Sequence, residues 1–435
     1  MAKSKEYSWM TKDKLMLYTL IALVILAVIT AAIWWPVTQK GWSLGLTLLT
    51  ICAIAVVVSV VLDYLLALVM KNKGPVNTMS ASVFGMIVAL SYSLGIPAMT
   101  MNEVLPLVAP EAFTYVAIVS AVGMIVFKKL QGLLGRKYVN PAATAKILVL
   151  IPFLYEILLP KDHISMINLM APVGYGDPTY FAETVNACYA PAESTADVLW
   201  TLAVAKYHGW PGGASSIAVI IVGIALFIMA RRYIKWRITA SYLITAAVMS
   251  LIMTAIYGGD ALLRLAFHLF VGSSIFLAFF MATDPATTPL TYKGQWIFGL
   301  GLGVLTILIQ TYMNFLGGSI LALVIMNLTS PLLDKIGIQK VTEEKVEKKL
   351  PKGKQFETVK TTSCIRCGAC MVICCHNLSP ILIKEAFDKG NTEVLKKLRA
   401  DLCDGCGNCN FVCPARIDLR NFTLRAKVSL RTAKN

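Results

Sequence analysis

The sequence is poor in charge. Only 15% of its 435 residues are Asp, Glu, Lys or Arg, whereas a soluble domain usually carries about 25%. With a hydrophobic fraction of 57% and a mean hydropathy of +0.68, this composition excludes an ordinary soluble domain. The charges are concentrated in the last quarter of the chain, which predicts a membrane part followed by a soluble part.

Acidic residues are the scarcer kind of charge. There are 24 of them against 40 Lys and Arg, which gives a formal net charge of +16. An excess of this size can indicate nucleic-acid binding, but it also follows from the positive-inside rule together with a basic tail. We favour the second interpretation and expect no nucleic-acid partner. A basic cytoplasmic face would attract an acidic electron carrier and anionic lipid.

Two kinds of motif are also missing. No nucleotide-binding motif is apparent, so NAD or quinone chemistry is expected on a partner protein. No cleavable signal peptide is evident, because the first apolar run is long enough to span a bilayer and is expected to be retained.

The apolar segments predict a helical protein that crosses the membrane several times. A span needs about 20 apolar residues, and inside a bilayer the backbone must satisfy its own hydrogen bonds, which favours helices. We expect about ten spans, and the candidates lie near 15–35, 43–70, 80–97, 111–127, 141–159, 214–230, 238–257, 262–282, 295–313 and 317–334.

Basic residues predict the orientation of these spans. They gather before the first span and after the second, fourth and sixth, whereas the alternate loops have few of them. By the positive-inside rule, both termini and the tail are therefore expected on the cytoplasmic side of the cytoplasmic membrane. The residues concerned are Lys3, Lys5, Lys12, Lys14, Lys71, Lys73, Lys128, Lys129, Arg136, Lys137, Arg231, Arg232, Lys235 and Arg237.

Two cytoplasmic loops, 132–144 and 281–291, combine Pro, small residues and hydroxyls beside a span. This composition suits a polar cavity that binds a ligand at the membrane surface, although simple turn chemistry explains it equally well. The candidate cofactor-binding residues in these loops are Asn140, Pro141, Thr283, Asp284 and Thr287.

Ionisable residues inside the predicted spans are candidates for ion coupling, because charge within a membrane is costly. Asp63 lies in the second span and His268 in the eighth, and we expect these two to handle ions or protons. Glu156 lies near the end of the fifth span, where its side chain can reach the membrane surface.

The tail contains nine of the 11 cysteines, and eight of them form two C-x2-C-x2-C-x3-C runs. This spacing is typical of two [4Fe–4S] clusters in which the fourth cysteine of each run binds the other cluster. Zinc and disulfides are the alternatives, but zinc sites favour pairs of C-x2-C. The spacing assigns Cys364, Cys367, Cys370 and Cys413 to cluster 1, and Cys403, Cys406, Cys409 and Cys374 to cluster 2.

The first run ends Cys374-Cys375-His376, where Cys-Pro is usual. We expect Cys375 to be a buried thiol that binds no metal, although it could compete with Cys374 as a ligand. His376 could tune a cluster through a hydrogen bond or could simply be solvated.

These motifs carry a family resemblance. Residues 15–335 resemble the D subunit of the Rnf complex and the B subunit of the Na⁺-pumping NADH:quinone oxidoreductase, through LQGLLGRKYVNPA and HLFVGSSIFLAFFMATDPATTP. Residues 360–430 resemble the C-terminal ferredoxin domain of the Rnf C subunit, through CIRCGAC and DLCDGCGNCNFVCPARIDL. The resemblance implies two inverted five-helix halves fused to a two-cluster domain of the ferredoxin type.

The resemblance also implies flavin. In the family, a Thr of a Ser-Gly-Ala-Thr motif between the fifth and sixth spans carries FMN through a phosphoester. The matching place here is Ser194-Thr195-Ala196-Asp197, where Asp197 takes the Thr position and Thr195 is the nearby alternative anchor. Related B subunits also hold riboflavin, which implies a noncovalent flavin near the two cytoplasmic loops.

The sequence therefore predicts a membrane domain over 1–338, a charged linker over 339–360 and a cytoplasmic two-cluster domain over 361–435. The function expected is that of an electron-transfer subunit in an Rnf-like complex, which passes electrons between the clusters and membrane flavin and couples them to Na⁺ or H⁺ movement. Its expected partners are the other subunits, a soluble electron carrier or dehydrogenase subunit, and the bilayer. The alternative is a transporter or channel with a redox-sensing tail, and a third possibility is a plain membrane anchor.

Overall fold

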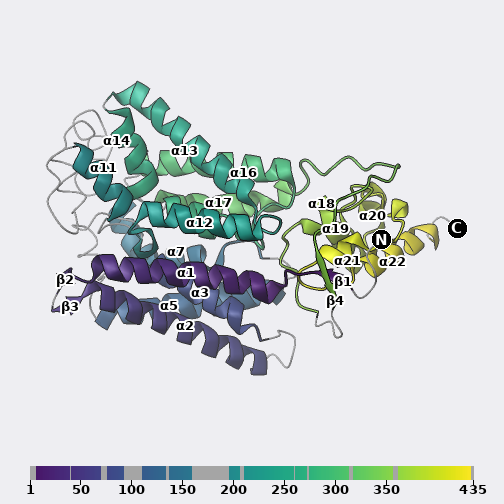
Figure 1. The fold of residues 1–435 in the computed structure, drawn as a ribbon, viewed down its shortest axis with the longest axis horizontal. Coiled ribbons are helices and arrows are strands. Elements are labelled where there is room, and N and C mark those ends of the chain that lie inside the picture. The colour runs from purple at the N-terminus through teal and green to yellow at the C-terminus, as the bar shows by residue number, and fades with distance from the viewer. Residues whose placement is uncertain are drawn as a thin grey trace.

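The computed structural model describes residues 6–39, 41–69, 76–92, 110–133, 137–158, 195–205, 210–258, 260–271, 274–312, 317–355 and 361–432. These residues form a helical bundle with a smaller domain at one end (Figure 1). The part of the chain before the tail contains β1 (Glu6–Ser8), α1 (Lys12–Trp34), β2 (Thr38–Gln39), β3 (Trp42–Ser43), α2 (Leu44–Val69), α3 (Thr78–Leu90), α5 (Pro110–Val122), η1 (Gly123–Leu130), α6 (Gln131–Leu133), α7 (Pro141–Leu158), α11 (Thr195–Val204), η2 (Pro211–Gly213), α12 (Ser216–Ala230), α13 (Trp236–Tyr257), α14 (Ala261–Ala266), η3 (Phe267–Val271), α15 (Ser274–Phe276), η4 (Leu277–Met281), α16 (Tyr292–Tyr312) and α17 (Gly318–Leu333). The tail contains β4 (Gly353–Gln355), α18 (Ala369–Val372), α19 (Pro380–Asp388), α20 (Thr392–Lys397), η5 (Ala400–Leu402), α21 (Asn408–Val412) and α22 (Leu419–Thr432).

The bundle is that of a multi-pass membrane protein. Among the described residues, five helices are long and apolar enough to cross a bilayer: α1, α2, α13, α16 and the continuous helix Ala112–Leu130. A sixth span would combine Ala261–Phe270 with Ser274–Met281, two pieces inclined to each other by 60°. The helices α3, α12 and α17 are apolar but shorter, so the length test alone does not reach the ten spans expected from the sequence.

Small residues let the bundle helices approach closely. A side chain added at Gly85 of α3 would lie 2.6 Å from the carbonyl oxygen of Ala55 in α2, and one at Gly299 of α16 would lie 2.6 Å from that of Ile238 in α13. Backbones that approach this closely pack tightly, as is common between helices in membranes. The outer surface carries exposed large apolar side chains on α2, α12 and α13, as expected of a surface that faces lipid.

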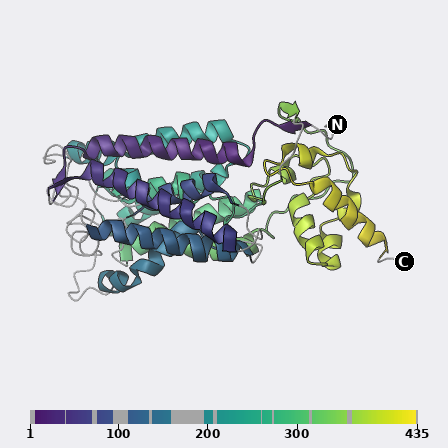
Figure 2. The same cartoon turned by 90° about the horizontal axis from the view of Figure 1, so that it is seen from below.

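The N-terminal segment of the chain belongs to the tail domain. Strand β1 pairs antiparallel with β4, with Glu6 opposite Gln355 and Ser8 opposite Gly353. The views in Figures 1 and 2 agree that β1 leads from α1 into the tail and that both ends of the described chain lie at this end of the molecule. With the pairing of β2 and β3, the structure therefore adds two small sheets to a fold that the sequence predicted to be all-α.

An apolar core joins the tail to the bundle. Leu15, Tyr233 and Leu290 from the bundle are buried in one cluster with residues of α18 and α21, including Cys370 and Val412. The tail is therefore packed against the bundle and is not merely tethered to it.

The segment expected to be a solvated linker takes part in this packing. Residues 339–352 form neither helix nor strand. The backbone N–H of Thr342 donates to the carbonyl of His376 at 3.2 Å, and that of Val346 donates to the carbonyl of Cys375 at 3.0 Å. The segment thus lies along the end of the first cysteine run.

Candidate functional site

Four cysteines of the tail line one cavity, here called cavity 1, with about 350 Å³ free of protein atoms. These four are the residues that the spacing assigns to cluster 1. Gly368 has φ of +76° and begins α18, so the chain turns sharply after the second cysteine of the run. The cysteines of cavity 1 are Cys364, Cys367, Cys370 and Cys413.

A second cavity of about 360 Å³, cavity 2, lies between the other four cysteines. Gly407 has φ of +82° and begins α21, as Gly368 begins α18. The cysteines of cavity 2 are Cys374, Cys403, Cys406 and Cys409, which are the residues that the spacing assigns to cluster 2.

The two cysteine runs share one backbone path. Left-handed φ angles occur at Arg366 (55°) and at Gly405 (73°), which hold matching places in the two runs. They recur at Asn377 (54°) and Arg416 (57°), three residues after each fourth cysteine. Each run therefore folds its first three cysteines around one cavity and sends its fourth to the other.

The chemistry of the donor set fits iron–sulfur clusters. Burial raises the pKa of Cys367 and Cys406 to about 12, so both are neutral thiols in the protein alone. Backbone N–H groups point at the sulfurs, as when that of Arg366 donates to Cys364 Sγ at 3.3 Å. Iron would hold the sulfurs as thiolates, and such hydrogen bonds are a known means of tuning a cluster.

A mononuclear metal site is a poorer fit. Within the described ranges, no three His, Cys, Asp or Glu side chains converge on a point that could hold one metal ion. Zinc needs its ligands at about 2.0–2.3 Å from a common centre. Four thiols spaced around a cavity suit a cubane, in which each iron takes one thiolate.

Cys375 and His376 lie beside cavity 2. The Sγ of Cys375 is 4.0 Å from that of Cys406 and accepts a hydrogen bond from the Asn408 amide at 3.2 Å. His376 lines the cavity, but its Nδ1 lies 3.1 Å from the carbonyl oxygen of Thr342. Cys375 is not among the residues lining cavity 2.

The bundle has a larger cavity at the end that faces the tail. This bundle cavity lies between α1, α3, η1, α12 and η4, and about 890 Å³ there is free of protein atoms, counting space that is open to solvent. The two loops singled out from the sequence meet there, because Asn140 and Pro141 line one side and Thr283 and Asp284 another. Thr287 does not line the cavity, but its hydroxyl lies 3.2 Å from Asp284 Oδ2.

The walls of the bundle cavity combine aromatic and charged groups. Phe84, Phe279 and Phe280 supply flat apolar surface, and Lys128 and Lys137 supply positive charge. Burial lowers the pKa of Lys137, and nearby Asp284 opposes that effect. Aromatic faces with a few placed polar groups are typical of sites for flat cofactors.

Tyr233 connects the bundle cavity to cavity 1. Its side chain lines the bundle cavity, and its hydroxyl lies 3.4 Å from the carbonyl oxygen of Val412. The residue after Val412 is Cys413, which lines cavity 1. One side chain and one peptide unit thus join the two cavities.

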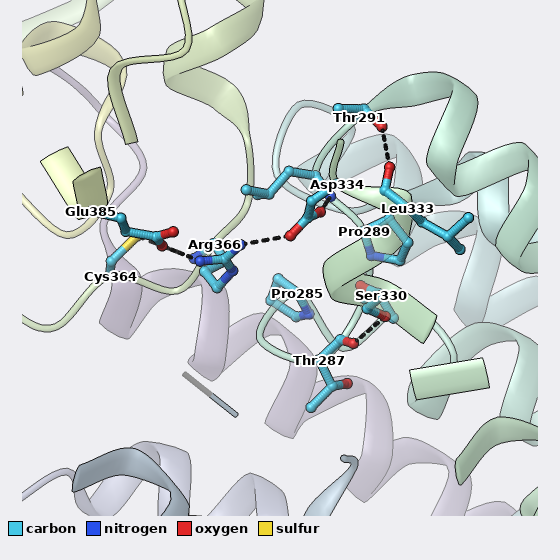
Figure 3. A network of polar contacts seen from close by, with 12 residues as sticks. Pro285, Thr287, Pro289, Thr291, Ser330, Leu333, Asp334, Cys364, Arg366 and Glu385 are labelled. Carbon is cyan, nitrogen blue, oxygen red and sulfur yellow. Dashed lines mark hydrogen bonds and ion pairs between the residues drawn. The ribbon is translucent and has the colours of Figure 1, made fainter. Parts of the chain in front are cut away.

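A buried ion pair fixes cavity 1 to the bundle (Figure 3). Arg366 lies between Cys364 and the bundle, and its guanidinium bonds Asp334 Oδ2 at 2.9 Å, with both side chains 6% exposed. The other Asp334 oxygen accepts the backbone N–H of Leu290 at 2.7 Å. Glu385 also pairs with Arg366. The loop that supplies Asp284 to the bundle cavity is therefore held by the same carboxylate that holds Arg366.

The two candidate ion-coupling residues are both buried and bonded. Asp63 Oδ1 pairs with Lys129 Nζ at 2.6 Å, and its Oδ2 accepts the backbone N–H of Asn77 at 2.7 Å. The Nδ1 of His268 lies 2.9 Å from Gln310 Oε1. Neither residue lines the bundle cavity. The side chains of Glu156, Thr195 and Asp197 lie outside what the structure describes.

Sequence reasoning missed Lys146, a basic residue inside the predicted fifth span. It is fully buried in α7, donates to the carbonyl of Ser91 and lies 4.0 Å from the centre of the Trp210 ring. A lysine inside an apolar run is itself a readable signal. Averaging hydropathy over the run conceals it. No pattern in the sequence marked Arg366 in this way. Its partner Asp334 lies in the bundle, and only the packing of the tail on the bundle brings the two side chains together.

The apolar helices, the bundle cavity at one end and the docked cysteine domain define a multi-pass membrane protein with candidate redox centres. A family model described as the NQR2, RnfD, RnfE family matches residues 7–343, so the chain belongs to this family. The match ends before the cysteine runs. The resemblance of the tail to a ferredoxin domain therefore stays a prediction.

Individual relatives agree with the family. The D subunit of the Na⁺-translocating ferredoxin:NAD⁺ oxidoreductase complex of Acetobacterium woodii is 29% identical over 313 residues, which cover 70% of this chain and 87% of the relative. The D subunit of the proton-translocating ferredoxin:NAD⁺ oxidoreductase complex of Clostridium ljungdahlii is 26% identical over 302 residues, covering 68% and 83%. The B subunit of the Na⁺-translocating NADH-quinone reductase of Pseudoalteromonas atlantica is 29% identical over 242 residues, covering 54% and 56%.

Proposed function

We propose that this chain is an electron-transfer subunit of an Rnf-like, ion-translocating oxidoreductase complex and acts only within that complex. One observation carries the proposal: two four-cysteine cavities lie in a domain packed on a membrane bundle, and one of them adjoins a cavity lined by aromatic and charged side chains. The relatives are named as subunits of such complexes, which also supports this function. The other subunits and a soluble electron carrier or dehydrogenase subunit are the proposed partners.

The eight cysteines of cavities 1 and 2 would hold two [4Fe–4S] clusters, and noncovalent riboflavin or FMN would lie in the bundle cavity. These cofactors would supply one-electron transfer. Asn140 and Asp284 would orient the flavin, and the phenylalanines would pack against its rings. Tyr233 and the Val412 peptide would keep water out of the junction between cavity 1 and the bundle cavity.

The fixed docking of the tail favours an electron route over a redox sensor. A tail that senses redox state would be expected to move relative to the bundle. Here cavity 1 is held against the bundle by the Arg366–Asp334 pair and by an apolar core. An ion flux that continues unchanged after removal of both clusters would favour the redox-sensing transporter instead.

The topology proposed has ten spans in two inverted halves, with domains at 1–338, 339–360 and 361–435. It adds α3, α7, α12 and α17 to the five long helices and the bent pair, since each of these four is an apolar helix of shorter or marginal length. Both ends of the described chain lie at the end that carries the tail, which supports an even number of spans (Figure 1). The basic loops support a cytoplasmic position for that end.

Metal and flavin analysis of the anaerobically purified complex tests the function. We expect about eight iron atoms and a matching amount of sulfide per chain, together with flavin absorbance. Protein that lacks both iron and flavin would refute the proposal.

Covalent FMN at Thr195 is a separate part of the proposal. Thr195→Ala is expected to abolish any flavin fluorescence that stays with the denatured chain in a gel, because a phosphoester needs the hydroxyl. Ser194→Ala is the matched control, and fluorescence retained in Thr195→Ala would remove this residue as the anchor.

A further inference from the structure

The last helix of the tail carries positive charge only. Helix α22 contains Arg420, Arg425, Lys427 and Arg431 and has no Asp or Glu among its 14 residues. Arg420, Leu424, Lys427 and Arg431 follow one another at helical spacing, so they form one face, here called the basic stripe. Arg420 and Arg431 are exposed, and Lys427 is half-buried.

The basic stripe lies over cluster 2 and not over cluster 1. Arg420 lines cavity 2, and Lys427 Nζ donates to the carbonyl of Cys403 at 2.7 Å. Leu424 lies against Gly405 of the same cysteine run. Cavity 1 is lined by Ile365, Cys370 and Ile381, which are buried in the core shared with the bundle, whereas cavity 2 reaches that core through Cys409.

Carboxylates near the stripe already have partners. Asp404 pairs with Lys345 at 2.7 Å, and Asp418 accepts the Asn410 amide at 2.6 Å. Lys345 neutralises Asp404, whereas the amide partner of Asp418 is neutral. Asp418 therefore offsets one of the four positive charges of α22, and a net positive charge remains available to a partner.

Lipid is a poor candidate for that partner. The apolar face of α22 is used inside the tail, since Leu419, Ala426 and Leu430 are buried there. In Figure 1, α22 also lies at the end of the molecule farthest from the membrane bundle. A helix that binds a bilayer needs a free apolar face and a place beside the membrane.

We propose that the basic stripe is the docking surface for a soluble, acidic one-electron carrier protein, which exchanges electrons with cluster 2. This inference rests on the proposed function and names the partner's chemistry and its place of contact. One electron moves between the carrier and cluster 2, so one partner is oxidised as the other is reduced. Charge complementarity of this kind mainly raises the association rate, and salt weakens it.

Stopped-flow reduction of the full membrane complex by a pre-reduced ferredoxin of net negative charge tests the proposal. Arg420→Glu/Arg431→Glu reverses two exposed charges of the stripe. The matched control, Lys349→Glu/Lys352→Glu, makes the same change at two exposed lysines beside Leu350, which packs in the core shared with the bundle. The single variant Arg431→Glu changes only the charge that does not line cavity 2. Comparing it with the double variant shows how much of the slowing depends on Arg420, which does line the cavity.

At low ionic strength we expect the double variant to be reduced about tenfold more slowly than the wild type, with a flatter dependence on salt. The control should stay within about twofold, because neither lysine lies on α22 or lines cavity 2. Equal rates in variant and wild type, equal slowing in the control, or loss of another subunit from the variant complex would overturn the docking surface. Dithionite followed by EPR reports both clusters without the carrier, so their absence from the wild type would instead refute the proposed function.

Discussion

The two cysteine runs have the same backbone but different surroundings. Around cavity 1 the chain places Ile365 and Ala369, and around cavity 2 the corresponding positions are Asp404 and Asn408. Cysteine and histidine follow Cys374, whereas proline and alanine follow Cys413. Cavity 1 is thus set in apolar surroundings beside one buried ion pair, while cavity 2 is set among polar groups.

The two cavities have the same kind of ligands, so the position of each cavity in the molecule would decide the role of the cluster that it holds. Cluster 1 would lie against the bundle and exchange electrons with a cofactor in the membrane domain. Cluster 2 would lie at the free end and exchange them with a soluble partner. Four predictions test this comparison, beginning with the one expected to have the largest effect.

Removal of a single ligand should separate the two clusters. Cys364→Ser is expected to lose cluster 1 and Cys406→Ser cluster 2, so that iron falls by about half in each while membrane insertion is unchanged. Iron analysis and EPR of the two variants would show two different remaining signals. Full iron content with normal turnover in either variant would contradict the ligand assignment.

Asp334→Asn should affect cavity 1 more than Asp404→Asn affects cavity 2. The first breaks a pair in which both side chains are 6% exposed, which typically costs about 3 kcal/mol. The second breaks a pair with Lys345 whose side chains are 44% and 29% exposed, so water screens the pair and its loss should matter less. The temperature at which the clusters bleach in detergent measures both effects. Equal shifts of that temperature in the two variants would argue against a special role for the buried Arg366–Asp334 pair.

Tyr233→Phe should loosen the junction between tail and bundle. The change removes a hydroxyl that lies 3.0 Å from Ser8 Oγ and 3.4 Å from the Val412 carbonyl, at a cost of about 1 kcal/mol. Hydrogen exchange should then become faster in β1 and α21. Tyr257→Phe removes a hydroxyl contact between half-buried Tyr257 and exposed Tyr312, far along the chain from the tail, and should leave exchange in the tail unchanged.

Cys375→Ala is expected to have the smallest effect. Its thiol contacts Cys406 and Asn408 beside cavity 2 but does not line it. Both clusters should be retained, with a loss of stability of about 1 kcal/mol for the smaller buried side chain. Iron reduced by half, as expected for Cys374→Ser, would make Cys375 a ligand.

The sequence predicted best what depends on short stretches of chain. Cysteines three or four residues apart are held by local turns, so their grouping was readable, including the exchange of Cys374 and Cys413 between the runs. The two loops around Asn140 and Asp284 were identified by composition, and the structure brings both to the bundle cavity.

Contacts between distant segments could not be read in the same way. The three residues Glu6–Ser8 are too few to show a strand pattern by themselves. They form a strand only by pairing with Gly353–Gln355, in the segment that we expected to be a linker. Asp63 stood out as a lone carboxylate in a span, but Lys129 from another helix pairs with it. In each case the partner depends on tertiary packing, which periodicity and spacing do not encode.

The pairing of β1 with β4 has a consequence for how the chain is made. Glu6 leaves the ribosome before the bundle helices, and Gln355 follows only after the whole bundle has been synthesised. At about 5–20 residues per second, the first strand waits for tens of seconds without its neighbour. The tail can therefore close only late in biogenesis, and a bulky tag fused ahead of Glu6 would obstruct its maturation.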